Sequence, residues 1–240
     1  MTVVGSSPAW PNPGGAHSGY LVESNGTRML LDCGPGVLAR LRQREEWPHV
    51  DAVAVSHFHL DHWGDLVPWV WGSLFRERPA NGDRPQLWVP PGGMPTLRTF
   101  GSELGYEDMF EQAFRVEEYE ELTPFRIGAF ELTTRRLPHY KLLTFGFRVS
   151  DGKHVLAYSG DSGPTPALAE LARDADVFLC EATLARGDLE GDLRGHLDAE
   201  EALGAFRDSG ARRLLLTHRP HELPLPAGVQ QVSDGYELDL

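Results

Sequence analysis

The most constraining feature of the sequence is a run of ionisable side chains at the end of an apolar segment. Residues 55–65 read VSHFHLDHWGD, and the first of them closes the apolar stretch AVAV at 52–55. Burial of one unpaired polar group costs on the order of 1–3 kcal/mol. Three histidines and two aspartates beside a core strand therefore need partners that offset this cost.

The spacing within this run is typical of metal ligands. His57 and His59 lie two positions apart, so their side chains share one side of an extended backbone. Asp61 and His62 are expected to follow in a turn. Because adjacent side chains tend to diverge, one tetrahedral metal ion could not comfortably use all four residues. Imidazole and carboxylate groups bind zinc, manganese or iron, so the run predicts a site that two metal ions share.

Three further candidate ligands follow predicted strands elsewhere in the chain. They are His139 in LPHY, Asp161 in YSGDSG and His218 in LLLTHRP. Catalytic ligands commonly lie on loops just past strands, where a rigid sheet fixes their geometry. We therefore expect these residues to meet the histidine-rich run at one sheet edge. The alternative is an accidental histidine-rich turn.

The rest of the sequence predicts two sheets with helices outside them. Each half of the chain contains strands and closes with helices, which is typical of two packed sheets covered on their outer faces. No repeat or linker-like segment interrupts the sequence, so we expect one domain over residues 1–240. Strands are predicted at 2–4, 20–23, 28–32, 52–55, 85–89, 115–119, 125–127, 130–136, 145–149, 155–158, 177–179 and 213–216, and helices at 63–76, 95–104, 165–172 and 199–209.

Composition restricts the location and the partners. The formal net charge of −13 disfavours extended nucleic-acid binding, because phosphate contacts supply most of that affinity. No segment approaches the roughly 18 apolar residues of a membrane helix, and the N-terminus lacks the features of a secretory signal. We therefore expect a cytoplasmic protein without a membrane partner. Cys33 and Cys180 are expected to be buried, reduced thiols.

The order HxHxDH, followed by a distant histidine, aspartate and histidine, resembles the metallo-β-lactamase superfamily. The resemblance implies an α/β sandwich with αββα layers and two divalent metal ions at one sheet edge, zinc first, with manganese or iron as alternatives. It also implies a ligand for each metal position: His57, His59 and His139 for one ion, Asp61, His62 and His218 for the other, and Asp161 as the bridge. An aspartate at position 161, rather than a cysteine, disfavours the true zinc β-lactamases.

Several segments resemble the phosphodiesterase branch of this superfamily, which includes ribonuclease Z and cyclic-nucleotide phosphodiesterases: LLDCGPG, PHYKLLTFGFRV, YSGDS, FLCEATL and GHLDAEEA. The resemblance implies that His196 contacts the scissile phosphate or assists the leaving group, and that Glu181 orients His196. Asp61 would take the proton of the attacking water. Asp32 is a candidate for orienting a ligand histidine. The plain alternatives are a helix neighbour for His196, a surface acid for Glu181 and a strand end for Asp32.

These features predict a metal-dependent hydrolase that acts on a small phosphodiester, such as a cyclic nucleotide or short nucleotide. Ribonuclease Z enzymes carry a long Gly/Pro-rich arm for tRNA, and the short segment between His139 and Asp161 leaves no room for one. Transfer RNA processing is therefore disfavoured. Hydrolysis of a carboxylic ester, thioester or lactone, and a non-catalytic metal-binding role, remain as alternatives. The resemblance also implies a homodimer.

Overall fold

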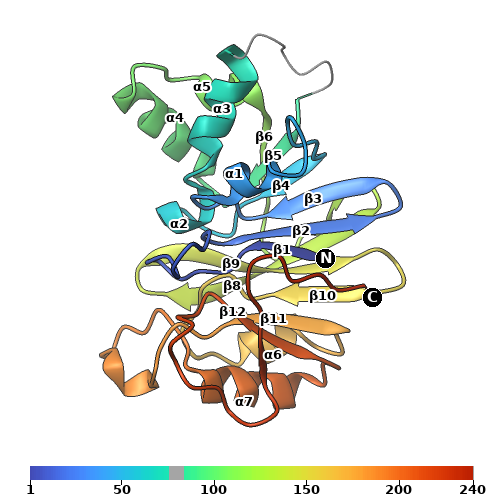
Figure 1. Ribbon diagram of the computed structural model, residues 1–240, viewed down its shortest axis with the longest axis vertical. Coiled ribbons are helices and arrows are strands. Elements are labelled where there is room, and N and C mark those ends of the chain that lie inside the picture. Colours follow the sequence, from blue (N-terminus) through green and yellow to red (C-terminus); the bar gives the residue numbers. More distant parts are fainter. Residues whose placement is uncertain (76–83, 240) are drawn as a thin grey trace.

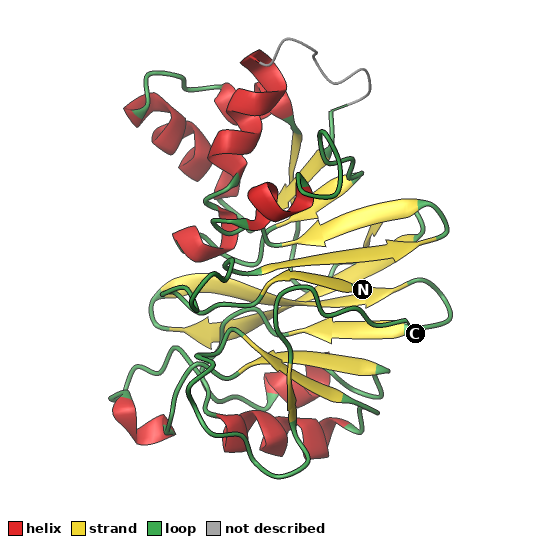
Figure 2. Ribbon diagram, in the orientation of Figure 1, coloured by secondary structure: helices red, strands yellow, loops and turns green. Residues whose placement is uncertain are grey.

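Two β-sheets pack face to face, and helices cover their outer faces. The computed structural model describes residues 1–75 and 84–239. Figure 1 shows the two sheets in the middle of the molecule, with one group of helices beyond each of them. Figure 2 shows the same four layers by type of secondary structure. The predicted αββα sandwich is confirmed.

The first sheet has strand order β1-β2-β3-β4-β5-β6. Its first three strands are antiparallel, whereas β3 to β6 run parallel to one another. The strands are β1 Thr2–Gly5, β2 Gly19–Ser24, β3 Thr27–Leu31, β4 Ala52–Ala54, β5 Gln86–Val89 and β6 Arg115–Glu118. The helices on its outer side are α1 Val37–Leu41, α2 Leu60–Trp63, α3 Leu66–Phe75, α4 Gly93–Glu103 and α5 Met109–Ala113.

The second sheet has strand order β13-β12-β11-β10-β9-β8-β7. Strands β10 to β13 run parallel, and β7 to β10 are joined as antiparallel neighbours. The strands are β7 Phe125–Ile127, β8 Phe130–His139, β9 Leu142–Ser150, β10 Val155–Tyr158, β11 Val177–Glu181, β12 Leu214–Thr217 and β13 Gln230–Gln231. Helices α6 Ala167–Leu171 and α7 Ala199–Ser209 cover it, and the short 3-10 helix η1 Gly187–Leu189 precedes α7.

Strand β4 shows how the sequence builds the layers. Its side chains alternate between faces. Val53 packs with the helices, whereas Ala52 and Ala54 lie in the core between the two sheets. The strand is buried on both faces, and this explains why its sequence is apolar throughout. The histidine-rich run therefore starts at the end of a fully buried strand, as the sequence indicated.

The predicted helix at 63–76 is wrong in extent, because the chain forms two helices there. Helix α2 ends at Trp63 and α3 begins at Leu66, and residue 76 lies outside the described residues. Asp65 stands between the two helices. Its carboxylate accepts a hydrogen bond from the backbone N–H of Leu38 at 2.8 Å, which ties the break to α1. The sequence analysis did not predict α1, α5 or β13.

Two expectations from composition can be compared with the structure. Cys33 and Cys180 are free and buried, as predicted. Across residues 1–75 and 84–239, no helix has both the length and the apolar character needed to cross a bilayer.

Candidate metal centre

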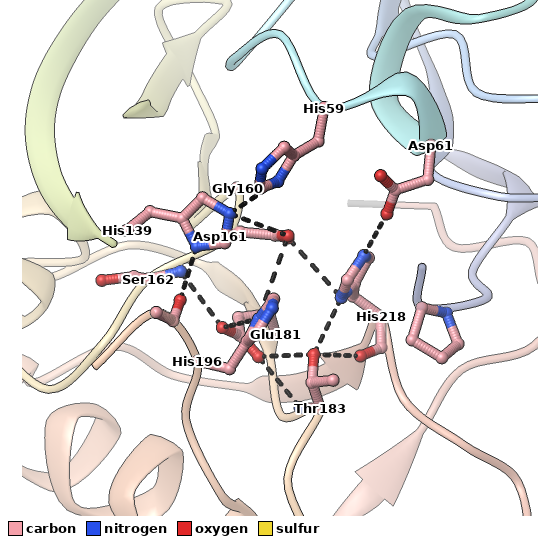
Figure 3. Close-up of polar contacts among 12 residues, drawn as sticks. His59, Asp61, His139, Gly160, Asp161, Ser162, Glu181, Thr183, His196 and His218 are labelled. Atoms are coloured by element: carbon pink, nitrogen blue, oxygen red, sulfur yellow. Dashed lines mark hydrogen bonds and ion pairs between the residues drawn. The ribbon is translucent and has the colours of Figure 1, made fainter. Parts of the chain in front are cut away.

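The predicted ligands come together at one edge of the two sheets. His57 and His59 follow β4, and Asp61 and His62 lie in α2, a single helical turn, where an open turn had been expected. The remaining three candidates sit at other strand ends: His139 is the last residue of β8, Asp161 follows β10 and His218 follows β12. Figure 3 shows side chains from these separate segments pointing toward one another around Asp161.

The ligand atoms form two overlapping groups, in each of which they lie within 4.8 Å of one another. The first group is His57, His59, His139 and Asp161, and the second is Asp61, His62, Asp161 and His218. Asp161 belongs to both groups: its Oδ2 lies 3.8 Å from Nε2 of His57, and its Oδ1 lies 3.3 Å from Nε2 of His62. This arrangement gives two adjacent positions for cations with one carboxylate between them.

Unpartnered polar atoms indicate that these groups fit metal ions. Nε2 of His57, Nε2 of His62 and Oδ1 of Asp161 are buried and accept or donate no hydrogen bond among the described residues. All three atoms face the shared region of the two groups. Buried polar groups normally have partners, so three such atoms without a hydrogen bond in one cluster are best explained by cations as their missing partners.

The first group is already in the protonation state that metal binding needs. Burial lowers the pKa of His57, His59 and His139, and each is further lowered by a neighbouring imidazole. Burial alone would raise the pKa of Asp161, but the histidines around it outweigh burial and hold its pKa well below the usual range. Neutral imidazoles and an ionised carboxylate are the forms that bind divalent cations.

The second group differs, because the surroundings of His62, one of its two histidines, favour the protonated imidazole. Burial alone would lower the pKa of His62. The carboxylates of Asp161, Asp32 and Asp61 outweigh it and raise the pKa of His62 well above its ordinary value. Burial likewise opposes ionisation of Asp61, yet His62 and His218 lower the pKa of its carboxyl. The second position is therefore a network of ion pairs until a cation replaces the proton.

Polar neighbours fix which imidazole nitrogen faces the cluster. Nδ1 of His62 donates to Asp32 at 2.7 Å, which confirms the contact expected for Asp32. Nδ1 of the other histidines pairs with groups that the sequence analysis missed: Ser56 Oγ for His57, the Gly195 carbonyl for His139 and Thr183 Oγ1 for His218. Nε2 of these four histidines is therefore the nitrogen on the side of the cluster, where that of His139 contacts His59 Nδ1 at 2.8 Å and that of His218 contacts Asp61 Oδ2 at 3.0 Å. Of these contacts, only the one from Ser56 had a signal in the local sequence, because this hydroxyl residue directly precedes His57.

Asp32 is the centre of a buried network that supports this arrangement. Its Oδ1 accepts the Ser56 backbone N–H at 2.7 Å, and its Oδ2 accepts the Ser56 and Tyr158 hydroxyls at 2.8 and 2.7 Å. These donors come from β10 and from the second residue after β4, so the network ties the two sheets together below the site. Asp32 itself has φ of 58°, a left-handed conformation that aspartate tolerates better than most residues.

His196 and Glu181 form a pair beside the cluster. Nδ1 of His196 donates to Oε1 of Glu181 at 3.0 Å, and the His196 ring stacks on His218 with centroids 5.7 Å apart. Glu181 is fully buried, so the surface-acid interpretation is wrong. Burial alone would lower the pKa of His196, but Glu181 outweighs it and raises the pKa to about 9. A protonated imidazole therefore faces the candidate metal centre.

Glu181 is held by several donors in addition to His196. Its Oε1 accepts the backbone N–H groups of Ser162 and Leu197, and its Oε2 accepts the backbone N–H and the hydroxyl of Thr183. The same Thr183 hydroxyl contacts Nδ1 of His218. Glu181 thus connects the His196 position with a candidate metal ligand through one intervening side chain (Figure 3).

His17 also lies at this site, although the sequence analysis did not single it out. It is half-buried, and its Nδ1 donates to the Pro8 carbonyl at 2.8 Å. Burial lowers its pKa, while the Asp61 carboxylate opposes that effect. A side chain at Gly34 would contact both the Asp61 carbonyl and Cβ of His17, so the N-terminal loop packs closely against α2. No pattern in the loop sequence indicated this contact.

Comparisons with known proteins agree with the geometry. Residues 27–219 match the family model described as the beta-lactamase superfamily domain. The chain is 28% identical to "Probable metallo-hydrolase YhfI" of Bacillus subtilis, over 92% of this chain and 87% of that protein. It is 36% identical to the protein Rv1339 of Mycobacterium tuberculosis, over 92% of this chain and 80% of that one.

Solved structures show the same fold. The crystal structure of the metallo-beta-lactamase fold protein YhfI from Bacillus subtilis superposes with a TM-score of 0.83 at 26% identity, covering 98% of this chain and 97% of that one. The short form of human tRNase Z superposes with a TM-score of 0.76 at 22% identity, covering 98% and 96%. The family-model match spans most of the sequence. The chain therefore belongs to the β-lactamase superfamily and has the metallo-β-lactamase fold.

Proposed function

We propose that this protein is a metal-dependent hydrolase with two metal ions that cleaves small phosphodiesters, such as a cyclic nucleotide or a short nucleotide. The observation that carries the proposal is the position of His196. Its Nδ1 is held by Glu181 at 3.0 Å and lies 3.9 Å from Asp161, the residue shared by both ligand groups, and Glu181 raises the pKa of the imidazole to about 9. A proton donor beside two cation positions suits a reaction that develops negative charge on oxygen.

The seven candidate ligands would hold the two ions in the groups described above. One position would use His57, His59 and His139, the other Asp61, His62 and His218, with Asp161 between them. Divalent ions bound there would lower the pKa of water and neutralise phosphate oxygens. This donor set suits zinc and also accepts manganese or iron.

The chain's own residues supply the proton transfers. Asp61 has a lowered pKa and an ionised carboxylate at the edge of the cluster, so it can accept the proton of the attacking water. His196 can donate to a phosphate oxygen or to the leaving group from the other side of Asp161. Glu181 holds the imidazole in one orientation and stabilises its charged form. A proton acceptor must be ionised and a proton donor must be protonated. The histidines around Asp61 and the Glu181 carboxylate beside His196 favour these two states.

A basic cleft beside His139 supports a phosphate-containing substrate. The cleft has a volume of about 490 Å³, and its lining includes Arg135, Arg136 and Lys141 together with one acidic residue, Glu121. Arg135 is paired with Glu170, whereas the side chains of Arg136 and Lys141 are exposed. In a chain with a net charge of −13, a cleft rich in cations next to the site favours an anionic ligand.

The relatives are consistent with this substrate class. A protein described as ribonuclease Z of Myxococcus xanthus is 29% identical over 91% of this chain and 86% of its own length, and one structural neighbour is described as a diphosphatase of the PhnP family. Only β9, β10 and their turns separate His139 from Asp161, so no long arm for tRNA is inserted there. We therefore favour a small phosphodiester over tRNA. The homodimer and the cytoplasmic location stay predictions.

A substrate panel tests the proposal. Metal-free protein would be supplied with zinc or manganese and assayed on bis(p-nitrophenyl) phosphate, cyclic nucleotides, a thioester and a lactone. We expect the largest kcat/KM on a phosphodiester. A larger kcat/KM on the thioester or lactone would replace the phosphodiesterase assignment with the ester-hydrolase alternative. Tight metal uptake without turnover of any substrate would support a non-catalytic metal-binding role.

A further inference from the structure

The loop that carries His196 is held by a contact from the opposite side of the site. Tyr140 directly follows His139 at the β8–β9 turn, and its hydroxyl donates a hydrogen bond to Oε1 of Glu190. Glu190 belongs to the segment between β11 and α7, 50 residues further along the chain. The contact therefore joins the β8–β9 turn to the segment that carries His196.

Glu190 uses its second oxygen to fix the backbone next to His196. Its Oε2 accepts the N–H of Gly195 at 2.7 Å and the N–H of His196 at 3.1 Å. Hydrogen bonds to an ionised acceptor are about twice as strong as neutral ones. One carboxylate thus holds both the tyrosine hydroxyl and two consecutive peptide groups of the catalytic loop.

The same backbone also contacts a candidate metal ligand. The carbonyl of Gly195 accepts a hydrogen bond from Nδ1 of His139 at 2.6 Å. The Tyr140 ring packs so closely on Gly195 that an added Cβ would lie 2.3 Å from its ring atoms. The ring centroid of Tyr140 lies 4.9 Å from that of His139 and 5.7 Å from that of His196. Tyr140 therefore touches the two imidazoles that the loop must align.

Apolar burial does not hold this part of the loop. Leu189 and Leu193 flank the segment and are 59% and 51% exposed. Arg194 ties the end of the loop to Glu201 in α7, and its Nε also lies 3.5 Å from Oε2 of Glu190. On this side the Gly195 and His196 peptide groups therefore depend on their polar contacts, whereas the buried Leu197 anchors the chain on the side of α7.

We propose that Tyr140 and Glu190 form a latch that positions His196 and the Gly195 carbonyl for the reaction. Both are positioning residues, since they act through His196 and His139. The part of this inference that concerns turnover rests on the proposed function. The part that concerns loop position does not.

Three variants test the latch. Tyr140→Phe removes the hydroxyl and keeps the ring packing, and Glu190→Gln removes the charged acceptor. Asp192→Asn is the matched control, because it removes one negative charge from an exposed residue two positions from Glu190. The first measurement is amide hydrogen exchange by NMR on protein loaded with zinc. We expect exchange at Gly195 and His196 to be faster by about tenfold in Glu190→Gln, with a smaller change in Tyr140→Phe. The control should be unchanged.

The second measurement compares kcat and KM on two substrates. Bis(p-nitrophenyl) phosphate has a good leaving group that needs little protonation, whereas a cyclic nucleotide releases an alkoxide. Displacement of His196 should lower kcat for the cyclic nucleotide by about tenfold or more, with a smaller loss on the nitrophenyl ester and little change in KM. A general loss of structure would lower both activities alike.

The outcomes separate the latch from the proposed function. Unchanged amide exchange in both latch variants would overturn the latch, and so would equal losses of kcat on the two substrates. If the wild-type protein cleaves neither phosphodiester, the proposed function fails, and amide exchange alone still decides whether Glu190 positions the loop.

Discussion

The imidazole of His62 and the carboxylate of Asp32 lie 2.7 Å apart in a fully buried pair below the candidate metal centre. Asp32 comes from the residue after β3, and His62 comes from α2. The pair fixes the imidazole so that its Nε2 faces Asp61 and Asp161. The second cation position therefore depends on a residue that does not itself reach the cation.

Replacement of Asp32 should weaken metal binding at the second position. Asparagine tolerates the left-handed conformation of residue 32, so Asp32→Asn should fold, but it cannot accept all the hydrogen bonds that Asp32 accepts. We expect a loss of affinity for one of two metal ions of about 10- to 100-fold. Metal titration by calorimetry would measure it. Asp51→Asn is the control, because Asp51 accepts a backbone N–H remote from the site. Wild-type affinity at both positions would refute the role of Asp32.

The two metal positions should depend differently on pH. His62 has a raised pKa, so its protonated form is stabilised in the metal-free protein and a cation must displace that proton. Affinity at the second position should therefore rise with pH until the raised pKa is reached. The histidines of the first group have lowered pKa values and bind without proton release near neutral pH. Calorimetry in buffers of different ionisation enthalpy would count the protons. Equal proton release in both steps would contradict this assignment.

Removal of the His196 imidazole should affect turnover without affecting metal content. General acid catalysis typically contributes a factor of about 10² to 10⁴, so His196→Gln should lower kcat on a cyclic nucleotide by about a hundredfold or more. Metal analysis should still find two ions per chain. His154→Gln is a suitable control, because His154 is 39% exposed in the turn between β9 and β10. Loss of a metal ion from His196→Gln would mean that His196 is a ligand.

The close approach at Gly34 gives a steric prediction. A methyl group at this position would lie 2.0 Å from the Asp61 carbonyl oxygen, so the backbone that carries Asp61 and His62 would have to move. Gly34→Ala should lower the free energy of unfolding by about 1–3 kcal/mol and weaken the second metal position. Gly191→Ala is the control, since nothing lies within 4 Å of its added methyl group. Chemical denaturation would compare the two variants. Equal stability would show that α2 shifts at no cost.

The sequence predicted best where the signal was local. The helix at 199–209 agrees with α7 at both ends, because Asp198 and Glu201 form a capping box and Gly210 takes the left-handed conformation at the other end. The succession of strands along the chain and the strand-end positions of His139, Asp161 and His218 could likewise be read from sequence patterns. Helix α1 has only five residues and no side-chain cap, so it left no comparable signal.

Contacts between distant loops could not be predicted in this way. The sequence alone does not decide whether Glu181 is a surface acid or a partner of His196. Glu181 is buried because hydrogen-bond donors from three separate segments converge on it. The Tyr140–Glu190 contact and the approach of His17 to Asp61 depend in the same way on how loops from different strands meet. Periodicity gives the faces of a strand or helix, but it carries no information about which loops become neighbours.

The most direct test of the proposed function follows phosphodiesterase activity as metal ions are added to the metal-free protein. Bis(p-nitrophenyl) phosphate hydrolysis would be recorded against equivalents of zinc or manganese per chain, with bound metal measured in the same samples. The two ligand groups that share Asp161 predict that activity reaches its plateau at two bound ions per chain. Protein that binds two ions and leaves the phosphodiester intact would contradict the account.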